Sequence, residues 1–201
     1  VVGPEDPLAA GLVDKLTAAA IPVFGPPLRA AQLEASKLFS KQFMQRHRIP
    51  TAGAVTVTAR DDLEAVVSRL PGRAVLKQDG LAAGKGVLAS DDKQALLTFG
   101  REALEKGPLL IEEYLEGREL YSAVFGGKKP RVFPTWELVF RHPGSHPRIA
   151  TRAVKFSPPL QRRLGIVNRA ARLPAALERR VHKIARATWD ALSLSGYARI
   201  D

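Results

Sequence analysis

Residues 75–87 read Val-Leu-Lys-Gln-Asp-Gly-Leu-Ala-Ala-Gly-Lys-Gly-Val, an apolar segment, a glycine-rich loop and the start of a second apolar segment. Three glycines lie in this loop: Gly80, Gly84 and Gly86. Glycine allows positive φ angles and a close approach of the backbone to a ligand. Backbone N–H groups in such a loop, together with Lys77 and Lys85, offer a site for phosphate oxygens. We therefore predict a phosphate-binding flap between two antiparallel strands; a surface loop with solvated lysines is the alternative.

Two common phosphate-binding loops do not fit this spacing. A Walker A loop has four residues between its first glycine and the Gly-Lys pair, which Ser or Thr then follows. Here Gly80 and Gly84 enclose only three residues, and Gly86 follows Lys85. A dinucleotide-binding fingerprint, G-x-G-x-x-G, opens a helix, whereas residues that favour strands follow Gly86. The flap between two strands is the interpretation that is left.

Length and composition bound the class of protein. With 201 residues, 45% of them apolar, and a mean hydropathy of −0.09, the chain predicts one or two small globular domains. No apolar run approaches the ~18–20 residues of a membrane span, so no membrane partner is expected. The absence of cysteine excludes disulfides and thiolate metal sites and fits a cytoplasmic protein. Because the sequence opens on Val1 and stops at Asp201 directly after a strand-like segment, we expect truncation at both ends.

The charge balance is strongly basic, with 31 Lys and Arg against 20 Asp and Glu, a net charge of +11. Such a balance permits binding to nucleic acid through phosphate contacts. Arginine is nevertheless spread along the chain, aromatic residues make up only 6%, and no groove-reading motif occurs. Nucleic acid is therefore not the expected partner, and phosphate-bearing small substrates account for the positive charge.

The pattern of apolar residues predicts an α/β (α+β) protein. Helices are expected over 9–20, 32–44, 61–70, 90–99 and 174–192. Strands are expected over 1–2, 21–24, 55–58, 75–78, 87–90, 108–113, 121–125, 131–140, 149–155 and 195–201. Glu5 stands in a turn before the first helix, where it can act as a helix cap. The basic segment 160–173 is either a binding loop or an ordinary turn.

A second motif spans residues 108–120, which read PLLIEEYLEGREL. An apolar strand runs into Glu112 and Glu113, and a turn at Gly117 precedes another carboxylate, Glu119. A backbone hinge after such a strand can present one N–H and one C=O to the edge of an adenine ring. A carboxylate such as Glu119 can accept hydrogen bonds from both ribose hydroxyls. An exposed acidic strand end is the alternative.

The last seven residues read SGYARID. Arg199 and Asp201 alternate along a strand, so they share one face. Arginine can clamp an anionic transition state through bidentate contacts, and aspartate is the hard oxygen ligand that magnesium prefers. This strand therefore predicts a catalytic site that handles a charged, metal-bound group.

Together the three motifs resemble the ATP-grasp family. Residues 1–120 resemble phosphoribosylamine–glycine ligases in the flap DGLAAGKGV and in the runs LEASK and IPTA. The Asp-His-Lys-Arg and Thr-Gly-Gly-Met-Gly motifs of those ligases are missing from the later part of this sequence. Residues 130–201 instead resemble D-alanine–D-alanine ligases in the runs ATRAVKF and GYARID. The resemblance covers nearly the whole chain, but its two halves indicate different members of the family.

The resemblance implies an ATP-grasp fold in three parts: the end of an N-terminal α/β domain over 1–30, a lid lobe over 31–115 and an incomplete central lobe over 116–201. It implies an ATP-dependent carboxylate–amine ligase that works through an acyl phosphate. The cofactors would be ATP and Mg²⁺, with Mn²⁺ as a substitute, and the partners a small-molecule carboxylate and an amine. The alternative is a non-catalytic nucleotide- or nucleic-acid-binding module.

The resemblance also assigns roles to residues. The residues implied to bind ATP are Lys37, Lys77, Gly84, Lys85, Gly86, Glu112, Glu113, Tyr114, Leu115 and Glu119. Lys155 and Arg199 would be catalytic, Asp201 would hold the metal, and Glu5 would bind the amine substrate. Lys41 is expected to be structural. Two further metal ligands of the family, a Glu and an Asn, would lie beyond Asp201.

Overall fold

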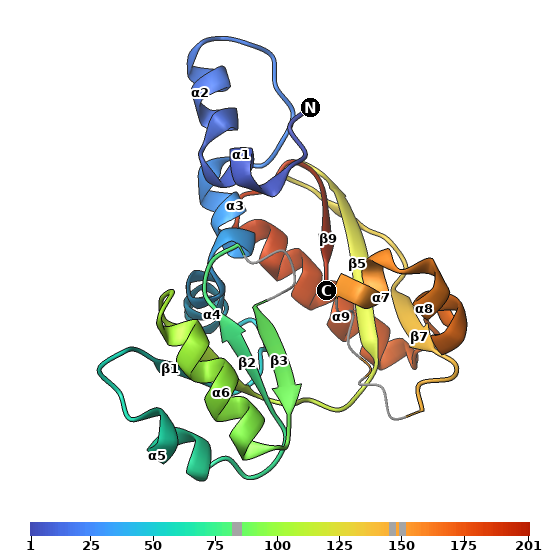
Figure 1. Ribbon diagram of the computed structural model, residues 1–201. Helices are drawn as coiled ribbons and strands as arrows, with labels where there is room; N and C mark the ends of the chain where they lie inside the picture. Colours follow the sequence, from blue (N-terminus) through green and yellow to red (C-terminus); the bar gives the residue numbers. More distant parts are fainter. Residues whose placement is uncertain (82–85, 145–147, 149–151) are drawn as a thin grey trace. The chain divides into compact units, whose positions relative to one another are not determined.

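The computed structural model describes residues 1–81, 86–144, 148 and 152–201 (Figure 1). The chain forms two compact units. Unit 1 combines Val1–Arg46 with Thr51–Leu115, and unit 2 combines His47–Pro50 with Glu116–Asp201. In the described ranges, no helix has both the length and the apolar character that a membrane crossing requires.

Unit 1 is built around a four-stranded antiparallel sheet in the order β1-β4-β2-β3. Its strands are β1 Ala54–Val57, β2 Ala74–Gln78, β3 Val87–Ser90 and β4 Leu109–Glu113. The predicted flap is confirmed as a connection between two antiparallel strands, because Lys77 at the end of β2 pairs with Val87 at the start of β3. Figure 1 shows α6 alongside β2, with which it is in contact.

The helices α5, Leu63–Ser68, and α6, Lys93–Leu104, close the core on one face of this sheet. Asp62 and Asp92 cap the two helices, because their carboxylates accept backbone N–H bonds from the first turn. Helix α6 continues to Leu104 rather than ending near Gly100. A Cβ at Gly100 would lie 2.8 Å from Leu63 Cδ2, so this glycine serves close helix packing and does not end the helix.

The N-terminal segment differs from the prediction. The strands expected over 1–2 and 21–24 are wrong: the two segments share a hydrogen bond from Val2 N–H to the Phe24 carbonyl (2.9 Å), but neither forms a strand. The helix expected over 9–20 is two helices, α1 Glu5–Ala9 and α2 Leu12–Ala18. Gly11, with a φ of 73°, separates them because a left-handed residue cannot continue a right-handed helix.

The helix expected over 32–44 is also divided, into α3 Leu28–Ala35 and α4 Lys37–Arg46. Ser36 between them is extended, with a φ of −136°. Its hydroxyl accepts a hydrogen bond from Phe39 N–H at 3.1 Å, which caps the start of α4. A serine inside an amphipathic pattern therefore begins a new helix here.

Unit 2 is a five-stranded sheet in which β5 Glu119–Gly126 is central. Strands β6 Arg131–Val132, β7 Trp136–Phe140 and β9 Gly196–Ile200 each pair with β5, and β8 Ile166–Ala170 extends the sheet beyond β7. The long helix α9, Ala175–Ala191, covers one face of the sheet. Its buried Trp189 and Ala185 pack on Val124 of β5.

Two helices follow β7, and one of them contradicts the sequence. Residues 152–155, expected in a strand, lie in α7 Arg152–Phe156, whereas residues 149–151 are outside the described ranges. Val154 on α7 packs with Leu164 of α8 Pro158–Leu164, so burial by a neighbouring helix stabilises the helical form. The basic segment 160–173 is divided between α8 and β8.

Candidate active site

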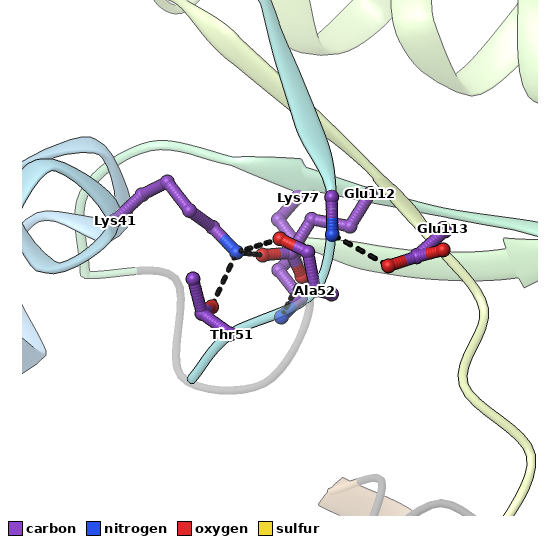
Figure 2. Close-up of polar contacts among 7 residues, drawn as sticks. Lys41, Thr51, Ala52, Lys77, Glu112 and Glu113 are labelled. Atoms are coloured by element: carbon purple, nitrogen blue, oxygen red, sulfur yellow. Dashed lines mark hydrogen bonds and ion pairs between the residues drawn. The ribbon is translucent and has the colours of Figure 1, made fainter. Parts of the chain in front are cut away.

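A buried carboxylate in unit 1 is shared by two lysines. Glu112, at 7% exposure on β4, contacts Lys41 Nζ through Oε1 (2.6 Å) and Lys77 Nζ through Oε2. Figure 2 shows Lys41 reaching this carboxylate and also Thr51 and Ala52. Lys41 Nζ donates to Thr51 Oγ1 at 2.6 Å and to the Ala52 carbonyl at 2.8 Å. One ion-paired cluster therefore ties α4 to β2, β4 and the segment before β1.

The electrostatics of this cluster differ between the two lysines. Burial by itself would raise the pKa of Glu112, but hydrogen bonds from Lys41 and Lys77 outweigh it, and the pKa is lowered. Two ammonium groups and one carboxylate leave a net charge of +1. The Lys41 side chain is 6% exposed and that of Lys77 is 32% exposed. Lys77 is therefore the member of the cluster that can still meet an anion.

A third lysine lies beside the loop that follows β2. Lys37 Nζ donates to the Gly80 carbonyl at 2.8 Å. Burial is the main cause that lowers the pKa of Lys37; the charges of Asp79 and Glu34 oppose this, and that of Lys77 adds to it. The Asp79 carboxylate accepts from Ser36 Oγ (3.1 and 3.2 Å) and from Leu38 N–H (3.2 Å). These hydrogen bonds hold the start of α4 against the loop that follows β2. Lys37 and Lys77 lie at the base of that loop.

Part of the predicted flap lies outside the described residues. Gly84 and Lys85 belong to that part. Gly86 is described and buried, and its carbonyl accepts from Gln78 N–H at 2.8 Å. The described base of the flap therefore consists of an extended hydrogen-bonded ladder with Lys77 at its end.

The predicted hinge residues at the end of β4 and directly after it have different surroundings. Glu113 Oε1 accepts from Gly53 N–H at 2.7 Å, so this side chain returns to the start of β1. The Arg73 guanidinium lies over the Tyr114 ring, 5.2 Å from its centre. Leu115 is exposed. The structure thus holds Glu113 and Tyr114 by contacts within unit 1 and leaves Leu115 open to solvent.

Unit 2 brings together four of the predicted residues. Arg199 donates from Nε and Nη2 to the two oxygens of Asp201 at 2.8 and 3.0 Å, and its guanidinium lies 5.4 Å from the centre of the Tyr121 ring. The pKa of Glu119 is raised, first by burial and then by the negative charge of Asp201. The charges of Lys155 and Arg199 oppose that rise. Glu119, Lys155, Arg199 and Asp201 are therefore near enough to interact.

Glu5, the candidate for binding the amine substrate, belongs to the N-terminal part of unit 1. It is exposed and opens helix α1, whose cap is Pro4. A carboxylate in the first turn is favoured by the helix dipole. The local structure thus accounts for an acidic residue at this position without a ligand.

Unit 2 contains two carboxylates that fit a magnesium ion, those of Glu119 and Asp201. The described part of the chain holds no group of three or more His, Asp or Glu placed to bind a metal. Magnesium, however, commonly takes only one or two carboxylates and completes its shell with water and phosphate oxygens. Asp201 and Glu119, whose charges interact, fit that limited donor set.

Sequence reasoning missed two features. Lys41 was expected to be structural, but the sequence did not show that its partner is the Glu112 carboxylate, which it shares with Lys77. Glu137 is 2% exposed, and its carboxylate accepts hydrogen bonds from Arg118 Nε at 2.7 Å and from Arg169 Nε at 2.6 Å. A single glutamate inside the apolar run WELVF was the signal for this second ion-paired cluster.

The fold and these clusters define the class as the ATP-grasp fold, which confirms the predicted fold class. D-alanyl-alanine synthetase A from Vibrio cholerae superposes with a TM-score of 0.75 at 16% identity, over 96% of this chain and 58% of that chain. The D-alanine–D-alanine ligase of Bacillus anthracis, solved with ATP, gives 0.70 at 24% identity, over 94% and 57%. At these identities the likeness concerns the fold alone.

Sequence similarity then shows the family. Residues 35–136 match the family described as phosphoribosylglycinamide synthetase, ATP-grasp (A) domain, and residues 1–34 match the N domain of the same enzyme. The chain belongs to this ATP-grasp (A) domain family.

Curated relatives of the chain include two phosphoribosylamine–glycine ligases. That of Leifsonia xyli is 43% identical over 120 residues, which is 60% of this chain and 29% of the relative. That of Caulobacter vibrioides is 43% identical over 140 residues, 66% of this chain and 33% of the relative. The chain therefore spans about a third or less of the length of these relatives.

Proposed function

We propose that this chain provides the nucleotide-binding lobes of an ATP-dependent ligase that joins a carboxylate to an amine through an acyl phosphate. Family membership and the relatives, which are named phosphoribosylamine–glycine ligases, support this proposal. The observation that carries it is the Lys77–Glu112–Lys41 cluster, which leaves a partly exposed ammonium at the base of a glycine-rich flap. An ammonium held in this way is suited to a phosphate group.

The predicted ATP-binding residues of unit 1 have distinct proposed roles. Lys37 and Lys77 would bind phosphate oxygens, and the flap would cover them. The flap residues with this role are Gly84, Lys85 and Gly86. The hinge residues that would meet the adenine are Glu112, Glu113, Tyr114 and Leu115. Since the Glu112 side chain is held by two lysines, its backbone is the group we propose to face the base.

The residues of unit 2 would serve the reacting groups. Glu119 would accept hydrogen bonds from the ribose hydroxyls. Arg199 and Lys155 would neutralise negative charge on the phosphoryl group during transfer, an electrostatic role that needs no covalent bond to the protein. Asp201 would bind Mg²⁺, or Mn²⁺ in its place, and the metal would supply further charge neutralisation. Glu5, which belongs to unit 1, would contact the amine substrate.

The proposed division of labour follows the three expected segments: 1–30 as the end of an N-terminal domain, 31–115 as the lid lobe and 116–201 as the central lobe. The N-domain match over 1–34 and the A-domain match over 35–136 support the first boundary. A cytoplasmic location stays a prediction from the sequence.

Titration of the full chain with ATP and Mg²⁺ tests the proposal, with heat of binding as the signal. We expect saturable binding, and Lys77→Ala should weaken it at least tenfold, because a hydrogen bond to a charged group contributes about 1.5–3 kcal/mol. Lys93→Ala is the matched control, since Lys93 is exposed and donates to the Ser68 carbonyl. Absence of saturable binding, or equal loss in both variants, contradicts the proposed function.

A second candidate, a non-catalytic module that binds nucleic acid, is favoured by the distribution of charge. Unit 2 contains 18 Lys and Arg against 6 Asp and Glu, a net charge of +12, whereas unit 1 contains 13 against 14. Tight binding of a single-stranded oligonucleotide with a steep salt dependence, and no binding of ATP, would support this candidate. Binding of ATP without oligonucleotide binding would exclude it.

A further inference from the structure

One face of the sheet in unit 2 carries large aromatic side chains that α9 does not cover. Phe125, Trp136 and Tyr197 are 57%, 45% and 69% exposed. On the opposite face, Val124, Ala198 and Ile200 pack around Trp189 of α9. Large contiguous patches of exposed apolar side chains are uncommon on soluble proteins and often mark binding sites.

The aromatic side chains line a groove of about 440 Å³. Its walls are Tyr121, Ala123, Phe125, Phe133, Trp136 and Tyr197, and Arg199 also lines it. A volume of this size lies within the range of small-molecule sites, which are typically apolar with a few fixed polar groups. Arg199 is the one charged residue among the described residues that line this groove.

The strand register explains why the groove leads to Arg199. The residue pairs across neighbouring strands are Phe125 with Tyr197, Ala123 with Arg199 and Tyr121 with Trp136. Because alternate residues of a strand point to the same face, Tyr197 and Arg199 lie side by side on β9. The groove is therefore continuous with the pair Arg199–Asp201.

Arg199 has donors for a second anion. Its bonds to Asp201 use Nε and Nη2, while a guanidinium carries five N–H donors. A ligand that suits both parts of this site has an apolar, flat body for the aromatic walls and one negative end for Arg199. A carboxylic acid with an aromatic or large aliphatic substituent has that chemistry.

We propose that this groove binds the apolar body of the carboxylate substrate, with the carboxylate at Arg199. The term substrate rests on the proposed ligase function; the binding site itself does not. The acid would be larger than the glycine and D-alanine in the names of the relatives and structural neighbours. Aromatic walls favour a larger acid, because the free energy of apolar burial increases with the surface removed from water.

Tryptophan fluorescence of the full chain tests this assignment, because Trp136 lines the groove and the other tryptophan, Trp189, is buried under the sheet. We expect 3-phenylpropionate to bind saturably and to protect Trp136 from acrylamide quenching. The uncharged amide of the same shape, 3-phenylpropanamide, should bind at least tenfold more weakly, and acetate should give no protection. In Arg199→Met, the difference between acid and amide should disappear.

Two variants separate the groove from general hydrophobic adsorption. Phe125→Ala should weaken binding of 3-phenylpropionate at least threefold. Phe156→Ala should leave it unchanged, since Phe156 is the same residue type and even more exposed but lies on α7 outside the groove. The comparison of acid with amide on the unaltered chain remains decisive if Phe125→Ala does not fold.

Several results would overturn the assignment: equal affinity for acid and amide, no saturable binding, or a concentration-dependent dimer that Phe125→Ala abolishes. ATP titrations run in parallel distinguish the two proposals. Binding of the acid without binding of ATP would contradict the ligase and leave the groove intact. Binding of ATP without binding of the acid would contradict the groove and leave the ligase intact.

Discussion

Lys41 and Lys77 hold opposite oxygens of a single carboxylate, that of Glu112. Their environments differ, because Lys41 is almost fully buried and Lys77 keeps about a third of its side chain in solvent. A buried charge that loses its partner is strongly destabilising, whereas an exposed one can be solvated. The stability of unit 1 therefore depends on the Lys41–Glu112 pair, and Lys77 is left available for binding.

Replacement of Glu112 by Leu should leave Lys41 buried without a counter-charge. We expect unit 1 to lose about 3–5 kcal/mol of its free energy of unfolding, the usual result when one partner of a buried ion pair is removed. Urea unfolding followed by circular dichroism measures the loss. Glu105→Leu is the control at an exposed site on the same unit and should change stability by less than about 0.5 kcal/mol. An equal, small effect of both changes would show that Lys41 has another partner.

The double variant Lys41→Met with Glu112→Leu should recover most of that loss. An apolar pair of similar volume removes both buried charges, and such replacements are often neutral or stabilising. The two single changes should thus be non-additive by about 2 kcal/mol or more, within the range for residues in contact. A double-mutant cycle in urea measures this coupling, and additive losses would contradict direct pairing.

The cluster around Glu137 in unit 2 should respond more weakly. Arg118 and Arg169 have side chains that are 46% and 56% exposed, so both can be solvated when the carboxylate is removed. Glu137→Leu should therefore cost less than Glu112→Leu, about 1–2 kcal/mol, typical of a lost hydrogen-bond partner. Urea unfolding of unit 2, reported by Trp189, gives the value. A loss as large as that of Glu112→Leu would mean that the arginines are not effectively solvated.

Glu119 should make the stability of unit 2 depend on pH. Its pKa is raised in the folded state, first by burial and then by Asp201, so folding binds this proton more tightly. The protonated Glu119 carboxyl contributes fully to the free energy of unfolding below its unfolded pKa of about 4.3. This contribution is lost as pH rises through the pKa of the folded state. Glu119→Gln should match the parent at pH 4 and exceed it in stability at pH 7.

Urea unfolding between pH 4 and pH 7.5 checks this expectation. Glu116→Gln, at an exposed carboxylate three positions earlier, is the matched control and should run parallel to the parent at every pH. If Glu119→Gln is less stable than the parent at pH 7, the charged form of Glu119 is favoured in the folded state and the assigned direction is wrong.

Substitution of Gly80 should lower the stability of unit 1 because of the backbone conformation at this position. Its φ is +91°, and an added Cβ would meet no atom within 4 Å. Gly80→Ala should therefore cost about 1–2 kcal/mol through the left-handed backbone, and it should weaken ATP binding because Lys37 donates to the Gly80 carbonyl. Gly72→Ala, also open to space but without a positive φ, should be neutral or slightly stabilising. Equal unfolding midpoints would exclude backbone strain at Gly80.

Local patterns predicted the elements that short-range chemistry controls. The antiparallel strands around the flap followed from the spacing of glycine and lysine in residues 75–87, and the helix expected over 90–99 is present as α6, which Asp92 caps. Alternation along a strand placed Arg199 and Asp201 together, and the structure joins them by two hydrogen bonds. These features depend on neighbours within a few residues, so the sequence contains them directly.

The tertiary structure decided which side chains on each helix or strand face become buried or ion-paired. Lys37 and Lys41 lie four positions apart on one helix, but only packing makes Lys41 the buried partner of Glu112 from a distant strand. Residues 152–155 read as a strand and became helical because a neighbouring helix buries Val154. The aromatic groove likewise exists only once β5, β7 and β9 are paired in register. Periodicity fixes which residues share a face, whereas burial and ion pairing depend on segments that the chain brings together only when it folds.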